Sequence, residues 1–92
     1  MNAKRKGNRQ EHRSKALLEA AGYRVIRSAA SLSEWDLIGI GPTDVVLLQV
    51  KSNRAPSPAE REALGLFPCP PNCKKLIHVF HDRQRWPVVT EL

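Results

Sequence analysis

Residues 34–51 read EWDLIGIGPTDVVLLQVK, two runs rich in Val, Ile and Leu on either side of a Gly-Pro-Thr-Asp turn signal. Such runs are typical of β-strands, and the residues between them favour a tight connection. The sequence therefore predicts a hairpin with strands at 34–40 and 45–51 and a loop at 41–44.

The register of this hairpin brings three polar side chains together. With a four-residue loop, Ile40 pairs with Val45, and the ladder places Asp36 opposite Gln49. Lys51 lies two residues beyond Gln49 and shares its face of the strand. The apolar hairpin is thus expected to end in a carboxylate, an amide and a lysine, an arrangement that a one-residue slip of register would break.

The remaining elements extend the hairpin to one small α/β domain. Asn8 is a helix-capping residue, Gly22 a helix stop, and residues 57–60 (SPAE) form a capping box with proline at the first helical position. Pro87 predicts an edge position or a bulge for the last strand. The predicted elements are a helix at 9–21, a strand at 23–28, a loop at 28–33, the hairpin, a helix at 57–64, and strands at 75–80 and 85–90.

This order, α-β-β-β-α-β-β, predicts an α/β fold with a small mixed sheet flanked by helices. A chain of 92 residues has room for one domain only, so residues 1–92 are expected to form it. Residues 1–8 are expected to be a flexible basic arm. Oligomerisation would help to stabilise a chain this short.

Charge indicates the kind of partner. There are 15 basic and 9 acidic residues, a formal net charge of +6. Near the N-terminus a single acid, Glu11, stands among Lys4, Arg5, Lys6, Arg9, Arg13 and Lys15. This indicates nucleic acid before membrane, with a solvated basic tail as the alternative. No membrane-spanning run or signal-peptide pattern is present, so a cytoplasmic location without membrane contact is expected.

The cysteines do not predict a metal site. Cys69 and Cys73 are the only two in the chain. Structural zinc usually takes four protein ligands, so this pair is a poor zinc site even with His78 or His81 near it. Two reduced thiols are expected in a cytoplasmic protein.

The cluster at the end of the hairpin has the oxygen ligands that hard cations such as Mg²⁺ prefer. Asp36 supplies a charged oxygen, the Gln49 side chain a neutral one, and the backbone carbonyl of Val50 a third. A bound cation would polarise a phosphoryl oxygen and acidify a water. Lys51 would stabilise charge that develops on the phosphate. The alternative from spacing alone is an Asp–Lys ion pair at the end of two strands.

Glu11 is a further candidate. It shares a stripe of the predicted first helix with Ser14, Leu18 and Ala21, so its carboxylate lies on the same face as core residues. The alternative is an exposed ion pair with Lys15 at i,i+4 spacing.

The motif D-x(n)-[EQ]-x-K on a hairpin after an N-terminal helix resembles the core of the PD-(D/E)XK nuclease superfamily. A wider pattern is similar to the archaeal-type Holliday junction resolvases and covers nearly the whole chain. It comprises Arg5-Lys6-Gly7, Glu11, residues 22–31 (GYRVIRSAAS), Asp36-Leu37-Ile38 and residues 85–91 (RWPVVTE). The resemblance implies a restriction-endonuclease-like core.

The resemblance also implies roles in catalysis. Asp36 and Gln49 would hold the metal, which is expected to be Mg²⁺, with Mn²⁺ as a substitute. Lys51 would be the catalytic lysine, and Glu11 would assist metal or water binding from the first helix.

DNA contacts follow in the same way. Ser31 matches the family's loop serine near the scissile phosphate, and Ser33 competes with it because the loop before Asp36 is slightly longer here. The basic residues expected to contact DNA are Arg5, Lys6, Arg9, Arg27 and Arg54, of which Arg5, Lys6 and Arg27 match the family.

Three positions depart from the family pattern. Trp35 stands where the superfamily's name expects proline, and His12 stands where resolvases often have arginine. Gln49 replaces the usual glutamate and removes one negative charge from the metal site. We therefore expect weaker metal affinity and a larger role for Glu11.

The function implied is structure-selective, metal-dependent cleavage of four-way DNA junctions, also called Holliday junctions, in DNA recombination and repair. Symmetric cleavage suits a homodimer, with Trp35, Leu66 and Phe67 as candidate interface residues and core burial as the alternative for each. The alternatives are a nuclease acting on flaps, nicks or duplex ends, an inactive DNA-binding module, and a basic structural protein. The presence of Glu11, Asp36 and Lys51 together argues against the inactive module and the structural protein.

Overall fold

The computed structural model describes residues 3–28 and 34–92, with the backbone alone for residues 3–8. The order of its elements agrees with the prediction. They are α1 (Ala3–Ala20), β1 (Arg24–Arg27), β2 (Leu37–Ile40), β3 (Val45–Ser52), α2 (Pro58–Leu66), β4 (Cys73–Phe80) and β5 (Val88–Glu91).

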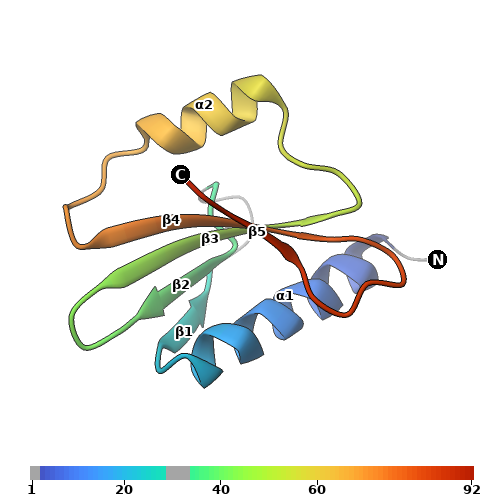
Figure 1. Ribbon diagram of the computed structural model, residues 1–92, viewed down its shortest axis with the longest axis horizontal. Coiled ribbons are helices and arrows are strands. Elements are labelled where there is room, and N and C mark those ends of the chain that lie inside the picture. Colours follow the sequence, from blue (N-terminus) through green and yellow to red (C-terminus); the bar gives the residue numbers. More distant parts are fainter. Residues whose placement is uncertain (1–2, 29–33) are drawn as a thin grey trace.

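The strands of this part of the chain form one mixed sheet in the order β1-β2-β3-β4-β5. The pairs β1–β2, β2–β3 and β4–β5 are antiparallel, whereas β3 and β4 are parallel and joined through α2. Figure 1 shows α1 on one face of the sheet and α2 on the other. The β3 strand is central and contributes buried residues to both faces, which fits its nearly continuous apolar sequence.

Two hydrophobic clusters, one on each face, hold the helices to the sheet. Between α1 and the sheet, Leu18 of the helix packs with Leu37, Val46 and Leu48. Between α2 and the sheet, Leu64 of the helix packs with Trp35, Leu47, Ile77 and Val79. Consecutive residues of β3 alternate between the two clusters, as the two-residue repeat of a strand requires.

Several boundaries agree with the local signals from which they were predicted. Ile40 pairs with Val45, as the four-residue loop predicts. The side chain of Ser57 accepts from the Glu60 backbone N–H at 3.2 Å, and the Glu60 carboxylate accepts from the Ser57 N–H at 3.2 Å, so the capping box is complete. Gly22 follows α1 with a φ of +99°, a conformation that favours glycine.

The predicted flexible arm is a correction. The helix begins at Ala3 and not near Arg9, so most of residues 1–8 belong to α1. Alanine, lysine and arginine are strong helix formers, and they outweigh the cost of Gly7. At the other end of the chain β5 begins at Val88, later than predicted, directly after Pro87, and it occupies a sheet edge as expected.

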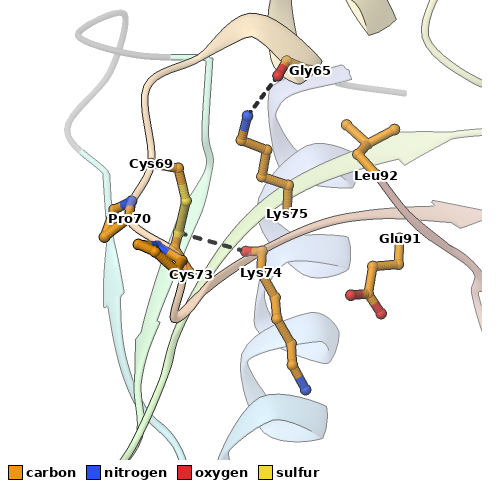
Figure 2. A pocket seen from close by; sticks show the side chains of 9 residues that line it. Gly65, Cys69, Pro70, Cys73, Lys74, Lys75, Glu91 and Leu92 are labelled. Carbon is orange, nitrogen blue, oxygen red and sulfur yellow. Dashed lines mark hydrogen bonds between the residues drawn. A yellow bond between two sulfur atoms is a disulfide. The ribbon is translucent and has the colours of Figure 1, made fainter.

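The two cysteines are a second correction, because Cys69 and Cys73 form a disulfide. The proline-rich turn before β4 brings their Cα atoms to 5.9 Å, a distance that a disulfide spans readily. Figure 2 shows this bridge beside a hollow at the far end of β4, where Lys75 Nζ donates to the Gly65 carbonyl at 2.8 Å. The disulfide links the α2–β4 connection to the first residue of β4.

In the described residues no helix is long and apolar enough to cross a membrane.

A buried polar pair fixes α1 on the sheet. Ser14 Oγ lies 2.8 Å from His78 Nδ1, and both residues are almost fully buried. Burial lowers the pKa of His78 from 6.5 to about 4, because the charged imidazolium would lose its water.

This pair predicts acid destabilisation. Below pH 6.5 the unfolded chain takes up a proton at His78, but the folded chain does so only near pH 4. Stability is therefore lost as the pH falls from about 6.5 to 4, by about 3 kcal/mol in all. Denaturant unfolding at pH 7 and at pH 4.5 measures it.

Because carboxylates also contribute to acid unfolding, the decisive comparison is between variants. His78→Gln is expected to lose less stability between pH 7 and pH 4.5 than the wild type. His12→Gln, which changes an exposed histidine on α1, the helix that carries Ser14, should keep the wild-type pH dependence. An unchanged pH dependence in His78→Gln would contradict the assignment.

Candidate active site

The polar end of the hairpin lies where β1 and β3 end and β2 begins. In the sheet Arg27 pairs with Leu37, Leu37 with Leu48, and Lys51 with Val79. If the ladder is continued by one residue, Asp36 stands opposite Gln49, as the sequence predicts. The sheet thus places the predicted catalytic residues of β2 and β3 at one end.

Asp36 is anchored to the neighbouring strand. Its Oδ2 accepts from the Val50 backbone N–H at 2.8 Å, and its own N–H donates to the Leu48 carbonyl at 2.9 Å. The carboxylate therefore takes the place of a backbone acceptor where the β2–β3 ladder ends. This contact fixes the side chain beside β3.

The pKa of Asp36 is raised, mainly because burial disfavours the ionised carboxylate. The hydrogen bond from Val50 opposes this shift, the negative charge of Glu11 adds to it, and the positive charge of Lys51 opposes it. A half-buried carboxylate with a raised pKa, close to a second acid and a lysine, is a common feature of active sites. A bound cation would stabilise the ionised form of the Asp36 carboxylate.

Gln49 is buried in the same region, with one amide oxygen unused. Its Nε2 donates to the Glu34 carbonyl at 3.3 Å, whereas its Oε1 is buried and has no hydrogen-bond partner in the described residues. A buried acceptor without a partner costs free energy. An oxygen of this kind fits a divalent cation, which would satisfy it.

Lys51 makes an ion pair that the sequence analysis did not foresee. Its Nζ lies 2.9 Å from Glu60 Oε2 on α2, and not in an ion pair with Asp36. The hydrogen bond from Lys51 is the main reason that the pKa of Glu60 is lowered, and the Ser57 N–H adds to it. The capping box fixes the Glu60 carboxylate, which in turn orients the lysine.

Glu11 also has a partner other than the one predicted from spacing. Its Oε1 accepts from Arg27 Nη2 at 2.9 Å and from Arg27 Nε at 3.2 Å. Lys15 pairs with Glu19 at 3.0 Å, so the alternative of a Glu11–Lys15 pair is wrong. The Glu11–Arg27 pair links α1 to the end of β1.

The other predicted residues are distributed around this end or lie outside the described residues. Arg9 is exposed on α1 and Arg54 is exposed in the connection from β3 to α2. Ser31 and Ser33 lie outside the described residues, as do the side chains of Arg5 and Lys6. The described residues hold no group of three or more His, Cys, Asp or Glu that could bind a metal, and Gln49 does not count toward such a group.

The candidate interface residues have different environments. Trp35 is 1% exposed and packs edge-on against Phe67, with ring centroids 5.7 Å apart, so it belongs to the core. Phe67 is half-buried in the same cluster. Leu66 is 74% exposed and is the one of the three that a partner could cover.

This combination of sheet, hairpin and polar cluster defines a class. The mixed sheet between two helices, with Asp36 and Lys51 at the open end of β2–β3, is the core of the PD-(D/E)XK nucleases. Gln49 occupies the position of that motif's second acid.

The family follows from a match of residues 2–60 to the model of the archaeal Holliday junction resolvases (Hjc). The chain belongs to this family and is a structure-selective, junction-resolving endonuclease. Its fold is similar to that of the Holliday junction resolvase Hjc of the archaeal hyperthermophile Archaeoglobus fulgidus, with a TM-score of 0.68 and 24% identity. That match covers 88% of this chain and 69% of the other. Among curated proteins no significant match is found.

Glu60 is the site residue that sequence reasoning missed. The capping box accounts for a glutamate at this position without any role in a site, so the motif concealed it. Its place nine residues after Lys51, on the helix that follows β3, is the signal that could have indicated it.

Proposed function

We propose that this chain hydrolyses phosphodiester bonds of four-way junctions with a divalent metal held by Asp36, Gln49 and the Val50 carbonyl, assisted by Glu11. Mg²⁺ is the proposed ion, with Mn²⁺ as a substitute. The observation that carries the proposal is the unpaired, buried Oε1 of Gln49, on the strand to which Asp36 is anchored.

The residues divide the work as follows. When bound, the metal polarises the phosphoryl oxygen and acidifies a water. The positive charge of Lys51 stabilises charge that develops on the phosphate, and its Nζ donates to the exposed Glu60 carboxylate, which orients it weakly. Glu11 places a second negative charge near Asp36, and Arg27 keeps it there.

The quaternary arrangement is part of the proposal. Paired cuts across a junction need two active sites related by a two-fold axis, so we propose a homodimer. The exposed Leu66 on α2 is the candidate interface residue. Light scattering that finds only monomer at concentrations where junctions are cut would remove the dimer. The substrate implies a cytoplasmic location, where the DNA is.

The test is cleavage of an end-labelled four-way junction, compared with flapped, nicked and intact duplex, in Mg²⁺, Mn²⁺ or EDTA. Paired symmetric cuts in the junction alone, lost in EDTA, support the proposal. Equal cutting of all substrates would keep the nuclease and remove the junction selectivity. Tight binding without cleavage in either metal would favour an inactive DNA-binding module.

Gln49→Glu tests the metal site separately. A second carboxylate is expected to lower the Kd for Mg²⁺ on the order of tenfold, because ligand charge sets affinity at such sites. It should also lower the Tm of the metal-free protein, since a nearly buried charge replaces an amide that donates to the Glu34 carbonyl. The rise in Tm on adding Mg²⁺ is therefore expected to be larger than in the wild type.

The matched control is Asn72→Asp, which makes the same chemical change in the turn before β4, at the other end of the sheet. It should leave the Mg²⁺-dependent rise in Tm as in the wild type. A Gln49→Glu protein with no tighter Mg²⁺ binding would show that this side chain does not contact the ion.

A further inference from the structure

The turn between β4 and β5, residues 81–87, lies at the same end of the sheet as the active site. β4 leaves the sheet at Phe80, which pairs with Ser52, the residue after the catalytic lysine. Figure 1 shows this turn beside the first half of α1. A surface formed by α1 and this turn is therefore next to the site of cleavage.

Basic side chains from α1 and the turn converge on a hollow of about 380 Å³. Arg9 and Arg13 line it from the helix, and His81, Asp82 and Arg83 from the turn, so three arginines stand with a single acid there. Neither Arg9 nor Arg83 has an ion-pair partner among the described residues. The lining thus has a net positive charge, and its arginines Arg9 and Arg83 are available to an anion as far as the described residues show.

The turn is held in one conformation by contacts from both sides. The Arg13 guanidinium donates to the carbonyls of Gln84 and Arg85, and it packs over the Phe80 ring with 4.5 Å to the centroid. Arg13 is therefore committed to the turn. These contacts of Arg13 hold the turn against α1.

A second set of contacts ties the turn to the strand that carries Lys51. The Asp82 N–H donates to Asn53 Oδ1 at 2.8 Å, and the Asn53 N–H donates to the Phe80 carbonyl at 2.8 Å. Arg83 follows with a φ of +68°, which a non-glycine residue adopts only at a cost. A strained arginine held in place beside an active site is preorganised for binding.

An exposed aromatic side chain adjoins the basic hollow. Trp86 is 60% exposed, and the Arg85 guanidinium lies 5.0 Å from its ring centroid. Basic side chains track a phosphate backbone, and aromatic side chains next to them contact sugars and bases.

We propose that Arg9, Arg83, Arg85 and Trp86, here called the turn surface, bind the sugar–phosphate backbone of one junction arm beside the scissile phosphate. The phosphates occupy the hollow between α1 and the turn, and Trp86 covers the adjoining nucleotide. This inference rests on the proposed function, because it assumes the same DNA substrate. It adds residues 83–86, at the other end of the chain, to the DNA contacts expected near the N-terminus.

Intrinsic fluorescence gives a direct test, because the chain has two tryptophans and Trp35 is buried. Wild-type protein is titrated with an intact four-way junction in EDTA, which allows binding without cleavage. Emission is expected to be quenched on binding, and acrylamide should then reach Trp86 less easily. Trp86→Phe retains only the core tryptophan and should show no change. Binding without quenching or protection would overturn the role of Trp86.

Affinity measurements test the arginines. The double variant Arg83→Asn, Arg85→Gln is chosen because asparagine tolerates a positive φ, so the turn keeps its conformation. Its Kd for the junction is expected to rise about tenfold, and the slope of log K against log salt should become shallower by about 0.9 per lost phosphate contact. Arg24→Ala, an exposed arginine at the opposite end of the sheet, is the matched control and should change neither.

The outcomes separate this inference from the function on which it rests. If the wild type cuts junctions while the double variant keeps its Kd and salt slope, the turn surface is wrong and the function stands. If the wild type binds with quenching of Trp86 but never cuts, the turn surface stands and the nuclease proposal fails. Equal quenching by heparin and by the junction would indicate a general polyanion site and overturn the assignment to a junction arm.

Discussion

Asp36→Asn is expected to abolish junction cleavage, on the order of 10³-fold, while raising the Tm of the metal-free protein. Cleavage falls because the amide cannot supply the charged ligand of the proposed metal site. Stability rises because burial raises the pKa of Asp36, so the folded state carries a cost when this carboxylate is ionised. Asparagine removes that charge, and its oxygen can still accept from the Val50 N–H.

The pH dependence checks the sign of this effect. A carboxylate whose folded pKa is above the unfolded one destabilises the fold at neutral pH, and the cost disappears as the pH falls below the unfolded value. The difference in Tm between Asp36→Asn and the wild type should therefore shrink on acidification. Asp44→Asn is the control, because Asp44 accepts from the Tyr23 hydroxyl at 2.7 Å at the other end of the sheet. It should retain cleavage and gain no Tm.

If Asp36→Asn cuts at the wild-type rate, the Asp36 carboxylate is not part of the active site. A variant that loses cleavage and also loses stability at neutral pH would show that the hydrogen bond to Val50 matters more than the cost of the buried charge. Calorimetry in EDTA and single-turnover cleavage in Mg²⁺ give the two readouts independently.

Local sequence signals were sufficient for the hairpin and the α2 boundary. With residues 41–44 as the loop, Ile40 pairs with Val45, so the register of the hairpin followed from the length of the turn. The capping box needs only residues 57–60, which are consecutive. Interactions that are complete within a few residues of chain can be predicted from sequence.

The partners of the charged site residues could not be predicted in this way. Glu11 had a carboxylate–lysine spacing that pointed to Lys15, yet it pairs with Arg27 from β1. Lys51 pairs with Glu60 because α2 docks over the end of β3. Both pairs depend on where a helix settles on the sheet, and this is decided by the packing of the whole core.

The burial of Trp35 and the disulfide depend on tertiary packing in the same sense. Trp35 is covered because Leu64 and Phe67 of the α2 region close over it. Cys69 and Cys73 meet because the prolines between α2 and β4 fold the chain back. Neither arrangement leaves a periodic signature in the sequence. The sequence therefore left an interface and a core position open for Trp35, and the prediction of two reduced thiols was wrong.

Lys51→Ala is expected to lower the single-turnover rate of junction cleavage by about 10²- to 10³-fold, because one positive charge near the scissile phosphate is lost. Glu60→Gln is expected to lower it by less than about fivefold, since an exposed ion pair orients the lysine only weakly. The matched controls are Lys75→Ala, near the start of β4 and away from the site, and Glu62→Gln, exposed on α2. Both should cut at the wild-type rate.

The titration of Glu60 shows which residue acts on which. Lys51 is the main cause of the lowered pKa of Glu60, so in Lys51→Ala this pKa should rise toward its ordinary value, with the Ser57 N–H retaining part of the shift. NMR of the carboxyl carbon measures it. If Glu60→Gln instead costs as much activity as Lys51→Ala, Glu60 takes part in the reaction itself. The carboxylate missing at Gln49 would then be supplied from α2.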